Sequence, residues 1–230
     1  MMKKIICVAL AAGAAIALAS CNSNSAPAAK FGVDRKTPLP EAVDIGLVVN
    51  GQAVKWASFN LGASEEYEYG NYYAWGETEP KEYYSSASYS PSDNDAAQVC
   101  LGDGWRMPTL DEFNALLALR EDKENYDWVD WAPALDGQGN EINDSKGNPI
   151  RGIRITHKSS GNSIFFPAAG LCSDRASGIN AGAIGSYWSS SLDPEFPSSA
   201  YTLFFGQGGS GRLSQHRFEG YPIRPVYCGQ

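Results

Sequence analysis

Apolar and polar side chains alternate most clearly near the C-terminus, in residues 184–226. Residues 200–206 repeat with a period of two, which is typical of a β-strand. A glycine-dense turn follows, and residues 212–217 and 221–227 continue as two further extended runs. Three short strands joined by tight turns predict a small antiparallel sheet with one buried face and one face in water. The water-facing side is expected to carry four polar side chains: Thr202, Ser214, His216 and Glu219.

Two earlier segments predict β-hairpins. Asn50 and Gly51 separate two apolar runs within residues 43–61, and this dipeptide is the strongest short hairpin signal. Residues 151–167 alternate, turn at a Ser-Gly-Asn sequence and return as a short apolar strand that a proline ends. The serine- and tyrosine-rich residues 83–95 are expected to form an irregular surface loop.

Residues 109–120 are the one segment with clear helical periodicity. Thr109 is placed to cap the helix, and Glu112 lies three residues later, which completes a capping box. Apolar residues then recur at helical spacing and predict a face that packs on the sheet: Leu110, Phe113, Leu116, Leu117 and Ala118. One clear helix among many short strands and loops predicts an α+β fold.

The start of the chain indicates the cellular context. Two lysines precede an apolar run from Ile5 to Leu18, and this run is too short to cross a bilayer, so it predicts a secretory signal over residues 1–21. The sequence Leu-Ala-Ser-Cys at its end resembles the bacterial lipoprotein cleavage box, so Cys21 is expected to be lipidated; an ordinary signal peptide is the alternative. Residues 22–40 are rich in Ser, Ala, Asn and Pro and predict a flexible tether. By length, residues 41–230 are expected to form one domain.

Charge narrows the range of partners. The chain has a net charge of −8, and loss of Lys3 and Lys4 with the signal makes the mature protein more acidic still. An acidic chain is a poor binder of nucleic acid or of an anionic membrane face. We therefore expect no nucleic-acid partner, and contact with the membrane only through the lipid anchor.

Cysteine usage leaves the disulfide pattern open. Cys100, Cys172 and Cys228 remain after the signal and the lipidated residue are set aside, in an oxidising compartment. One bridge with one free thiol is the simplest interpretation, and three free cysteines is the alternative. Both histidines, His157 and His216, are far from any cysteine in sequence, so we expect no metal site and no cofactor.

An acidic internal echo offers two interpretations. Residues 136–143 and 144–151 each begin with an aspartate and contain a Gly-Asn pair and an isoleucine. Clustered oxygen donors indicate a calcium loop, but the EF-hand glycine and glutamate are missing. We therefore prefer two Gly-Asn turns on a surface ribbon.

Two other sets of side chains are expected to have structural roles and not to bind a ligand. Arg106, beside Trp105, is expected to make a structural ion pair or stacking contact instead of binding a ligand. The aromatic side chains of residues 69–75 are expected to pack in the core and at its edge instead of forming a ligand cage.

Six ordered blocks resemble the signature of the Fibrobacter succinogenes major paralogous domain family, and together they cover nearly all of residues 41–228. They are KWA at 55–57 with NLG at 60–62, YGNYYAWGE at 69–77, GWRMPT at 104–109, IFFPAAG at 164–170, YWSS at 187–190 and IRPV at 223–226. The resemblance implies a C-type lectin-like fold, similar to its formylglycine-generating-enzyme branch, with a C-terminal sheet that presents a ligand surface. Many members carry a cysteine before the Gly-Trp-Arg block and another near the C-terminus, which implies a disulfide between Cys100 and Cys228.

Two functions of related folds are not carried over. The calcium-dependent sugar motifs of C-type lectins are replaced by Asp-Pro-Glu at 193–195 and Trp-Ser-Ser at 188–190, and a redox-active cysteine pair close in sequence is missing.

The C-terminal segment also resembles the variable region of lipoproteins diversified by retroelements. This resemblance implies a set of candidate ligand-binding residues: Ser186, Asp193, Ser198, Thr202, Phe204, Arg212, Ser214, Gln215, His216, Phe218, Glu219 and Tyr221. Trp188 is expected to be a further ligand-binding residue. Ordinary solvent-facing residues of a fixed domain are the alternative.

Three classes of function remain. The first choice is an outer-membrane lipoprotein of the cell envelope that binds a protein or glycan ligand, without calcium and as a monomeric domain. Whether it faces the periplasm or the outside is left open. The second is a structural or assembly component of a surface appendage or envelope complex. A hydrolase is the weakest, because neither histidine lies in a nucleophile motif and the acidic residues show no catalytic pairing, so we do not expect an enzyme.

Overall fold

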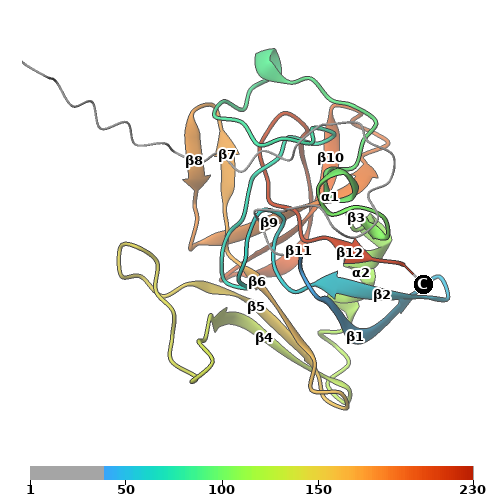
Figure 1. Cartoon of the computed structure of the whole chain (residues 1–230), viewed down its shortest axis with the longest axis vertical. Helices are drawn as coiled ribbons and strands as arrows, with labels where there is room; N and C mark the ends of the chain where they lie inside the picture. The colour runs from blue at the N-terminus through green and yellow to red at the C-terminus, as the bar shows by residue number, and fades with distance from the viewer. Residues whose placement is uncertain (1–38, 230) are drawn as a thin grey trace, which may run out of the picture.

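The computed structural model describes residues 39–229, and these form short antiparallel strands in small sheets, with two short α-helices within that range (Figure 1). The α+β prediction is confirmed. The predicted signal, the lipidation residue Cys21 and most of the tether lie outside the described residues. Within residues 39–229, no helix is both long and apolar enough to cross a membrane.

The first sheet joins the start of the described chain to its end. Its strands, in spatial order, are β1 (Ala42–Val49), β2 (Gln52–Ala57), β12 (Val226–Tyr227) and β3 (Trp105–Arg106). Asn50 and Gly51 take φ values of 50° and 78°, which suit the tight turn, so the predicted β1–β2 hairpin is confirmed. Val226 lies opposite both Trp56 and Arg106, and β12 therefore closes this sheet.

The second sheet has the order β11-β10-β9. Its strands are β9 (Ile184–Leu192), β10 (Ser199–Gly206) and β11 (Gly209–His216). The predicted strands at 200–206 and 212–217 are confirmed, and a turn joins them. The predicted third strand at 221–227 is wrong, because β9 takes that place and only Val226–Tyr227 form a strand, in the first sheet.

The third sheet has the order β4-β5-β6, beside a separate hairpin. Its strands are β4 (Tyr126–Pro133), β5 (Arg151–His157) and β6 (Ser163–Pro167), and the hairpin is β7 (Leu171–Ser173) with β8 (Ala176–Ile179). The predicted hairpin over 151–167 is confirmed, whereas β4 was not predicted from its polar surroundings.

The acidic echo forms two turns of the same design. Asp136 Oδ1 accepts the backbone N–H groups of Gln138 and Asn140 at 2.8 and 2.9 Å. Asp144 repeats the pattern with Lys146 and Asn148 at 2.9 and 2.8 Å. Hydrogen bonds lower the pKa of both carboxyls. The largest contribution comes from the side chain of Asn140 for Asp136 and from the backbone N–H of Asn148 for Asp144. Because these oxygens already cap their own turns, the geometry favours the turn interpretation over the calcium loop.

Of the two α-helices in residues 39–229, the sequence predicted only α2 (Leu110–Ala118). Helix α2 begins after Thr109, and the capping box with Glu112 is formed, as predicted. Helix α1 (Ala96–Leu101) was not predicted; Asp95 caps it by accepting the N–H of Ala97 at 2.8 Å, and its six residues are too few to show a period. A short 3₁₀ turn, Ser86–Ser88, interrupts the loop predicted at 83–95.

A chain of aromatic rings runs through the main core. Trp56 stacks on Phe113 at 5.8 Å between ring centroids and meets the edge of Phe166 at 5.5 Å. Phe166 contacts Tyr187 at 5.3 Å, and Tyr187 stacks on Phe205 at 6.1 Å. All five side chains are buried, so one core joins α2 to the three sheets.

A buried guanidinium holds the sheets together beside this core. Arg224 is fully buried and donates to Asn60 Oδ1 at 2.8 Å, to the carbonyl oxygen of Ala57 at 3.0 Å and to that of Phe165 at 2.7 Å. Burial lowers the pKa of Arg224 to about 10, so the group is still charged at neutral pH. These bonds tie the segment before β12 to β2 and β6.

The predicted disulfide is absent. Cys228 is an exposed free thiol and Cys172 is a buried one, so the pairing of Cys100 with Cys228 is wrong for this structure. The Sγ atom of Cys228 instead accepts a hydrogen bond from Arg106 at 3.0 Å. Arg106 also donates to Glu112 at 2.8 Å, which confirms its predicted structural ion pair.

Candidate functional site

Five of the predicted ligand-binding residues are buried, and they are corrected here. Ser186, Trp188, Thr202 and Tyr221 are at most 2% exposed, and Asp193 is 5% exposed. The alternation of β10 was read correctly, but both faces of this strand are covered along most of its length. When both faces of a strand are covered, its own sequence does not indicate that a distant segment buries the second face.

The cover on this second face comes from a distant aromatic segment. The indole N–H of Trp188 donates to the carbonyl oxygen of Tyr73 at 2.7 Å, and its ring lies 4.8 Å from that of Tyr221. Ser186 donates to the hydroxyl of Thr202 at 3.1 Å within the same buried layer. These four predicted residues therefore support the binding surface from below and do not form it.

Most of the remaining predicted residues lie on and after strand β11, the edge strand of its sheet, whereas Ser198 is exposed just before β10. Arg212, Ser214 and His216 are exposed, and Gln215 is partly exposed. Phe218 and Glu219 continue the surface into the following turn and are also partly exposed, as is Phe204 on β10. We call residues 212–219 the β11 ridge.

A nearly buried carboxylate organises one end of this ridge. Asp193 accepts the backbone N–H of Glu195 at 3.0 Å, and hydrogen bonding from the hydroxyl of Ser214 is the main reason that the pKa of Asp193 is lowered. Tyr201 also contacts this carboxylate, and desolvation followed by the nearby charge raises the pKa of Tyr201. Tyr201 was not among the candidates, because the period of two that placed Thr202 in water placed its neighbour Tyr201 on the buried face.

Further contacts restrict the side chains of the β11 ridge. Arg212 donates to the side-chain oxygen of Asn114 on α2 at 3.0 Å. The rings of His216 and Phe218 stack at 5.2 Å with an interplanar angle of 10°. Glu219 accepts the hydroxyl of Tyr221 at 2.9 Å. Each of these contacts restricts a side chain that also reaches solvent.

Within the β11 ridge, Arg217 lies between two aromatic rings. Its guanidinium is 4.4 Å from the ring centroid of Trp75 and 5.5 Å from that of Tyr89. Trp75 is fixed in turn, because its indole N–H donates to the carbonyl oxygen of Ser189 at 2.9 Å. The prediction that the aromatics of residues 69–75 are packing residues is confirmed for Tyr73, which is 1% exposed, whereas Trp75 is only partly buried.

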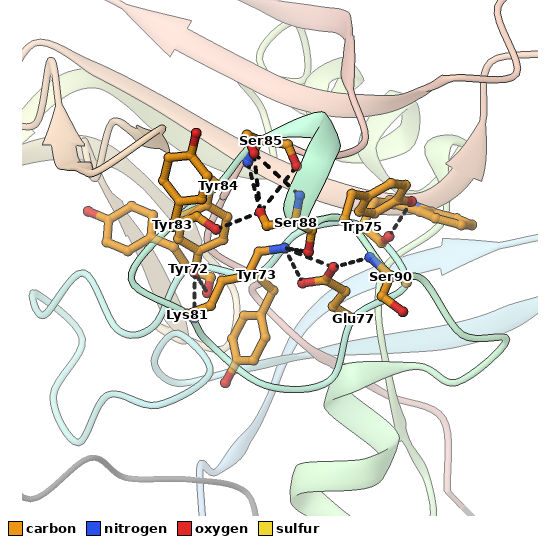
Figure 2. A network of polar contacts seen from close by, with 12 residues as sticks. Tyr72, Tyr73, Trp75, Glu77, Lys81, Tyr83, Tyr84, Ser85, Ser88 and Ser90 are labelled. Atoms are coloured by element: carbon orange, nitrogen blue, oxygen red, sulfur yellow. Dashed lines mark hydrogen bonds and ion pairs between the residues drawn. The ribbon is translucent and has the colours of Figure 1, made fainter.

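Figure 2 shows the polar network of this aromatic segment. Lys81 Nζ lies 2.7 Å from a carboxylate oxygen of Glu77 and donates to the carbonyl oxygen of Ser88 at 3.0 Å. The hydroxyl of Tyr84 donates to the carbonyl oxygen of Tyr72 at 2.6 Å. The serines and tyrosines predicted to be a plain surface loop therefore form an ordered structure, and their density in the sequence was the available signal.

Within residues 39–229, no group of three or more His, Cys, Asp or Glu side chains lies close enough to hold a metal ion. No family model, curated protein or solved structure matches the chain.

Proposed function

We propose that the protein is a lipoprotein of the cell envelope whose C-type lectin-like domain binds a ligand through the β11 ridge without transforming it. The observation that carries the proposal is the exposure of Arg212, Ser214 and His216 on edge strand β11, which pairs along its other edge with the mostly buried strand β10. Few helices, small antiparallel sheets and the meeting of both ends of the domain in one sheet are compatible with the lectin-like fold.

Preorganisation supports a binding role for the ridge. A binding surface loses less conformational entropy on association when its side chains are already restricted. Asn114 holds Arg212, and Phe218 stacks on His216. Below them, the buried bonds of Trp188 and Arg224 keep the backbone in place.

The direct test is binding of the purified full-length chain to a panel of envelope glycans and proteins. We expect at least one saturable interaction, and the triple change Arg212→Ala, His216→Ala and Phe218→Ala should weaken it at least tenfold, since interface hot spots each contribute about 2 kcal/mol or more. A matched variant, Gln138→Ala with Lys146→Ala on the exposed turns, should bind normally. Equal loss in both variants, or full binding by the ridge variant, contradicts the proposal.

Anchoring is tested separately. In the native host, Cys21→Ala should release the protein from the membrane fraction, whereas Cys7→Ala should not, because only Cys21 lies in the lipoprotein box. Mass spectrometry of the mature N-terminus checks the lipid itself. An unmodified Cys21 in the wild-type protein would exclude the anchor without affecting the binding proposal.

Diversification of the C-terminal segment predicts where sibling strains differ. Substitutions should concentrate in the β11 ridge and spare Trp188, Thr202 and Tyr221, since these three side chains are buried. Sequencing the locus in related strains measures this directly. Substitutions spread evenly over the exposed surface would indicate a fixed domain.

A further inference from the structure

A second surface feature lies apart from the β11 ridge, in the space between residues 70–84 and the β7–β8 hairpin. It is a cavity of about 250 Å³ whose lining includes Tyr72, Tyr84, Cys172 and Arg175. This volume equals that of about eight water molecules at about 30 Å³ each. The cavity is therefore large enough for one sugar ring and too small for a folded partner.

The walls of the cavity are fixed before any ligand arrives. The hydroxyl of Tyr72 donates to the carbonyl oxygen of Ala169 at 2.6 Å, and that of Tyr84 donates to the carbonyl oxygen of Tyr72 (Figure 2). Tyr84 and Asp174 exchange backbone hydrogen bonds of 2.8 and 2.7 Å, which join the aromatic segment to the hairpin. Tyr84 is only 3% exposed and serves as wall, whereas Tyr72 is partly exposed and is the ring that a ligand can reach.

The thiol that lines the cavity is part of its wall. Cys172 is 2% exposed, and its thiol donates to Ser177 Oγ at 3.3 Å. Burial raises the pKa of Cys172, so the thiol remains protonated at neutral pH and is a poor nucleophile.

The charged side chains at the rim of the cavity differ in whether they have an ion-pair partner. Lys81 is neutralised by Glu77 at 2.7 Å. Arg175 stacks over the ring of Tyr83 at 5.4 Å and makes no hydrogen bond or ion pair with the residues that the structure describes. Glu82 likewise has no such partner within residues 39–229. The rim therefore presents one guanidinium and one carboxylate to an incoming ligand.

This combination selects a class of ligand. A stacked guanidinium keeps its N–H edge free, and that edge matches a carboxylate with two parallel hydrogen bonds. Glu82 accepts hydrogen bonds only, which suits the hydroxyls of a sugar, and Asn71 at the same cavity adds an amide. The partly exposed ring of Tyr72 suits the apolar face of a sugar ring.

We propose that this cavity binds one carboxylate-bearing sugar unit of the uronic acid class. Arg175 holds the carboxylate, Tyr72 faces the sugar ring, and Glu82 accepts hydrogen bonds from the sugar hydroxyls. The site does not depend on the β11 ridge, because none of its lining residues belongs to residues 212–219.

The test compares three probes with the same sugar ring: glucuronic acid, which carries a carboxylate, and its methyl ester and glucose, which are both uncharged. Binding to the full-length chain is measured by calorimetry and by saturation-transfer NMR. We expect glucuronic acid to bind at least tenfold more tightly than the ester or glucose, since a charge-assisted hydrogen-bond pair is lost in both. Arg175→Ala should remove this preference, and Arg175→Lys should retain only part of it, because an ammonium group lacks the planar fork.

Two further variants locate the site. Ala176→Phe fills the cavity without changing its charge and should abolish binding of all three sugars. Arg120→Ala, which removes an exposed arginine paired with Asp130, should leave binding unchanged. Circular dichroism confirms that each variant is folded.

Each contrary result overturns the proposal. These are no binding of glucuronic acid at millimolar concentration, equal binding of the acid and its ester, or binding that persists in folded Ala176→Phe protein. Failure of the ridge variants to affect a macromolecular ligand bears on the proposed function alone.

Discussion

At the scale of single residues, Arg224 illustrates how a buried charge is retained without a carboxylate partner. Its fork reaches three oxygens at once, from Asn60, Ala57 and Phe165. Lysine carries the same charge but cannot form this planar set of bonds. Arg224→Lys should therefore leave buried acceptors unsatisfied and lower the free energy of unfolding by about 3 kcal/mol.

Urea denaturation measures this loss. The control is Arg212→Lys, an exposed arginine, where the change should be within about 0.5 kcal/mol. Equal effects at the two positions would show that the fork of Arg224 contributes nothing beyond its charge.

Tyr73 makes a second prediction at this scale, through pH. Burial raises the pKa of Tyr73 to about 12 from its ordinary value of 10. The unfolded chain therefore loses this proton near pH 10 while the folded protein keeps it, so the stabilising contribution is complete below pH 10 and is lost between pH 10 and 12. At about 1.36 kcal/mol per pH unit, the loss reaches about 2.7 kcal/mol.

Tyr73→Phe should remove this part of the alkaline destabilisation. The free energy of unfolding, measured by urea at pH 8 and at pH 12, should fall less in the variant than in the wild type by about 2 to 3 kcal/mol. The value at pH 8 isolates any effect of the lost hydroxyl. Parallel pH curves for the two proteins would mean that Tyr73 is not protected in the folded state.

At the scale of elements, short sequence motifs correctly predicted the turns and helix ends that depend only on neighbouring residues. Asn50 with Gly51 predicted the first hairpin, and Thr109 with Glu112 predicted the start of α2. Pairing between distant segments could not be read in this way. The partners of Val226 are set by the whole fold, and the burial of Thr202 depends on the aromatic segment that covers it. The exposure of Arg212, Ser214 and His216 was therefore predicted, whereas Thr202 was wrongly expected to face water.

Strands β5 and β6 pack closely enough to require a glycine. A Cβ atom added to Gly152 would lie 2.0 Å from the carbonyl oxygen of Phe166, which is backbone and cannot move aside alone. Gly152→Ala should therefore push the strands apart and cost about 3 kcal/mol, as overpacked cores do. At Gly137 an added Cβ meets nothing within 4 Å, so Gly137→Ala serves as the control.

Thermal unfolding of both variants checks this prediction. Gly152→Ala should lower the melting temperature clearly, while Gly137→Ala should leave it near the wild-type value. A stable Gly152→Ala protein would mean that the sheet can widen at this point without cost.

At the scale of the whole molecule, strand β12 joins two ends of the domain that are far apart in sequence. Val226 is fully buried and pairs with β2 on one side and β3 on the other. Val226→Asp would place an unpaired carboxylate in the core, which costs several kcal/mol, whereas Cys228→Asp changes an exposed residue of the same segment. Hydrogen exchange should then show protection lost together in β1, β2, β3 and β12 for Val226→Asp, because the sheet is closed by this strand. If the β1–β2 hairpin kept its protection while β12 alone exchanged, the C-terminal strand would be an addition to the fold and could not fix the frame on which the β11 ridge stands.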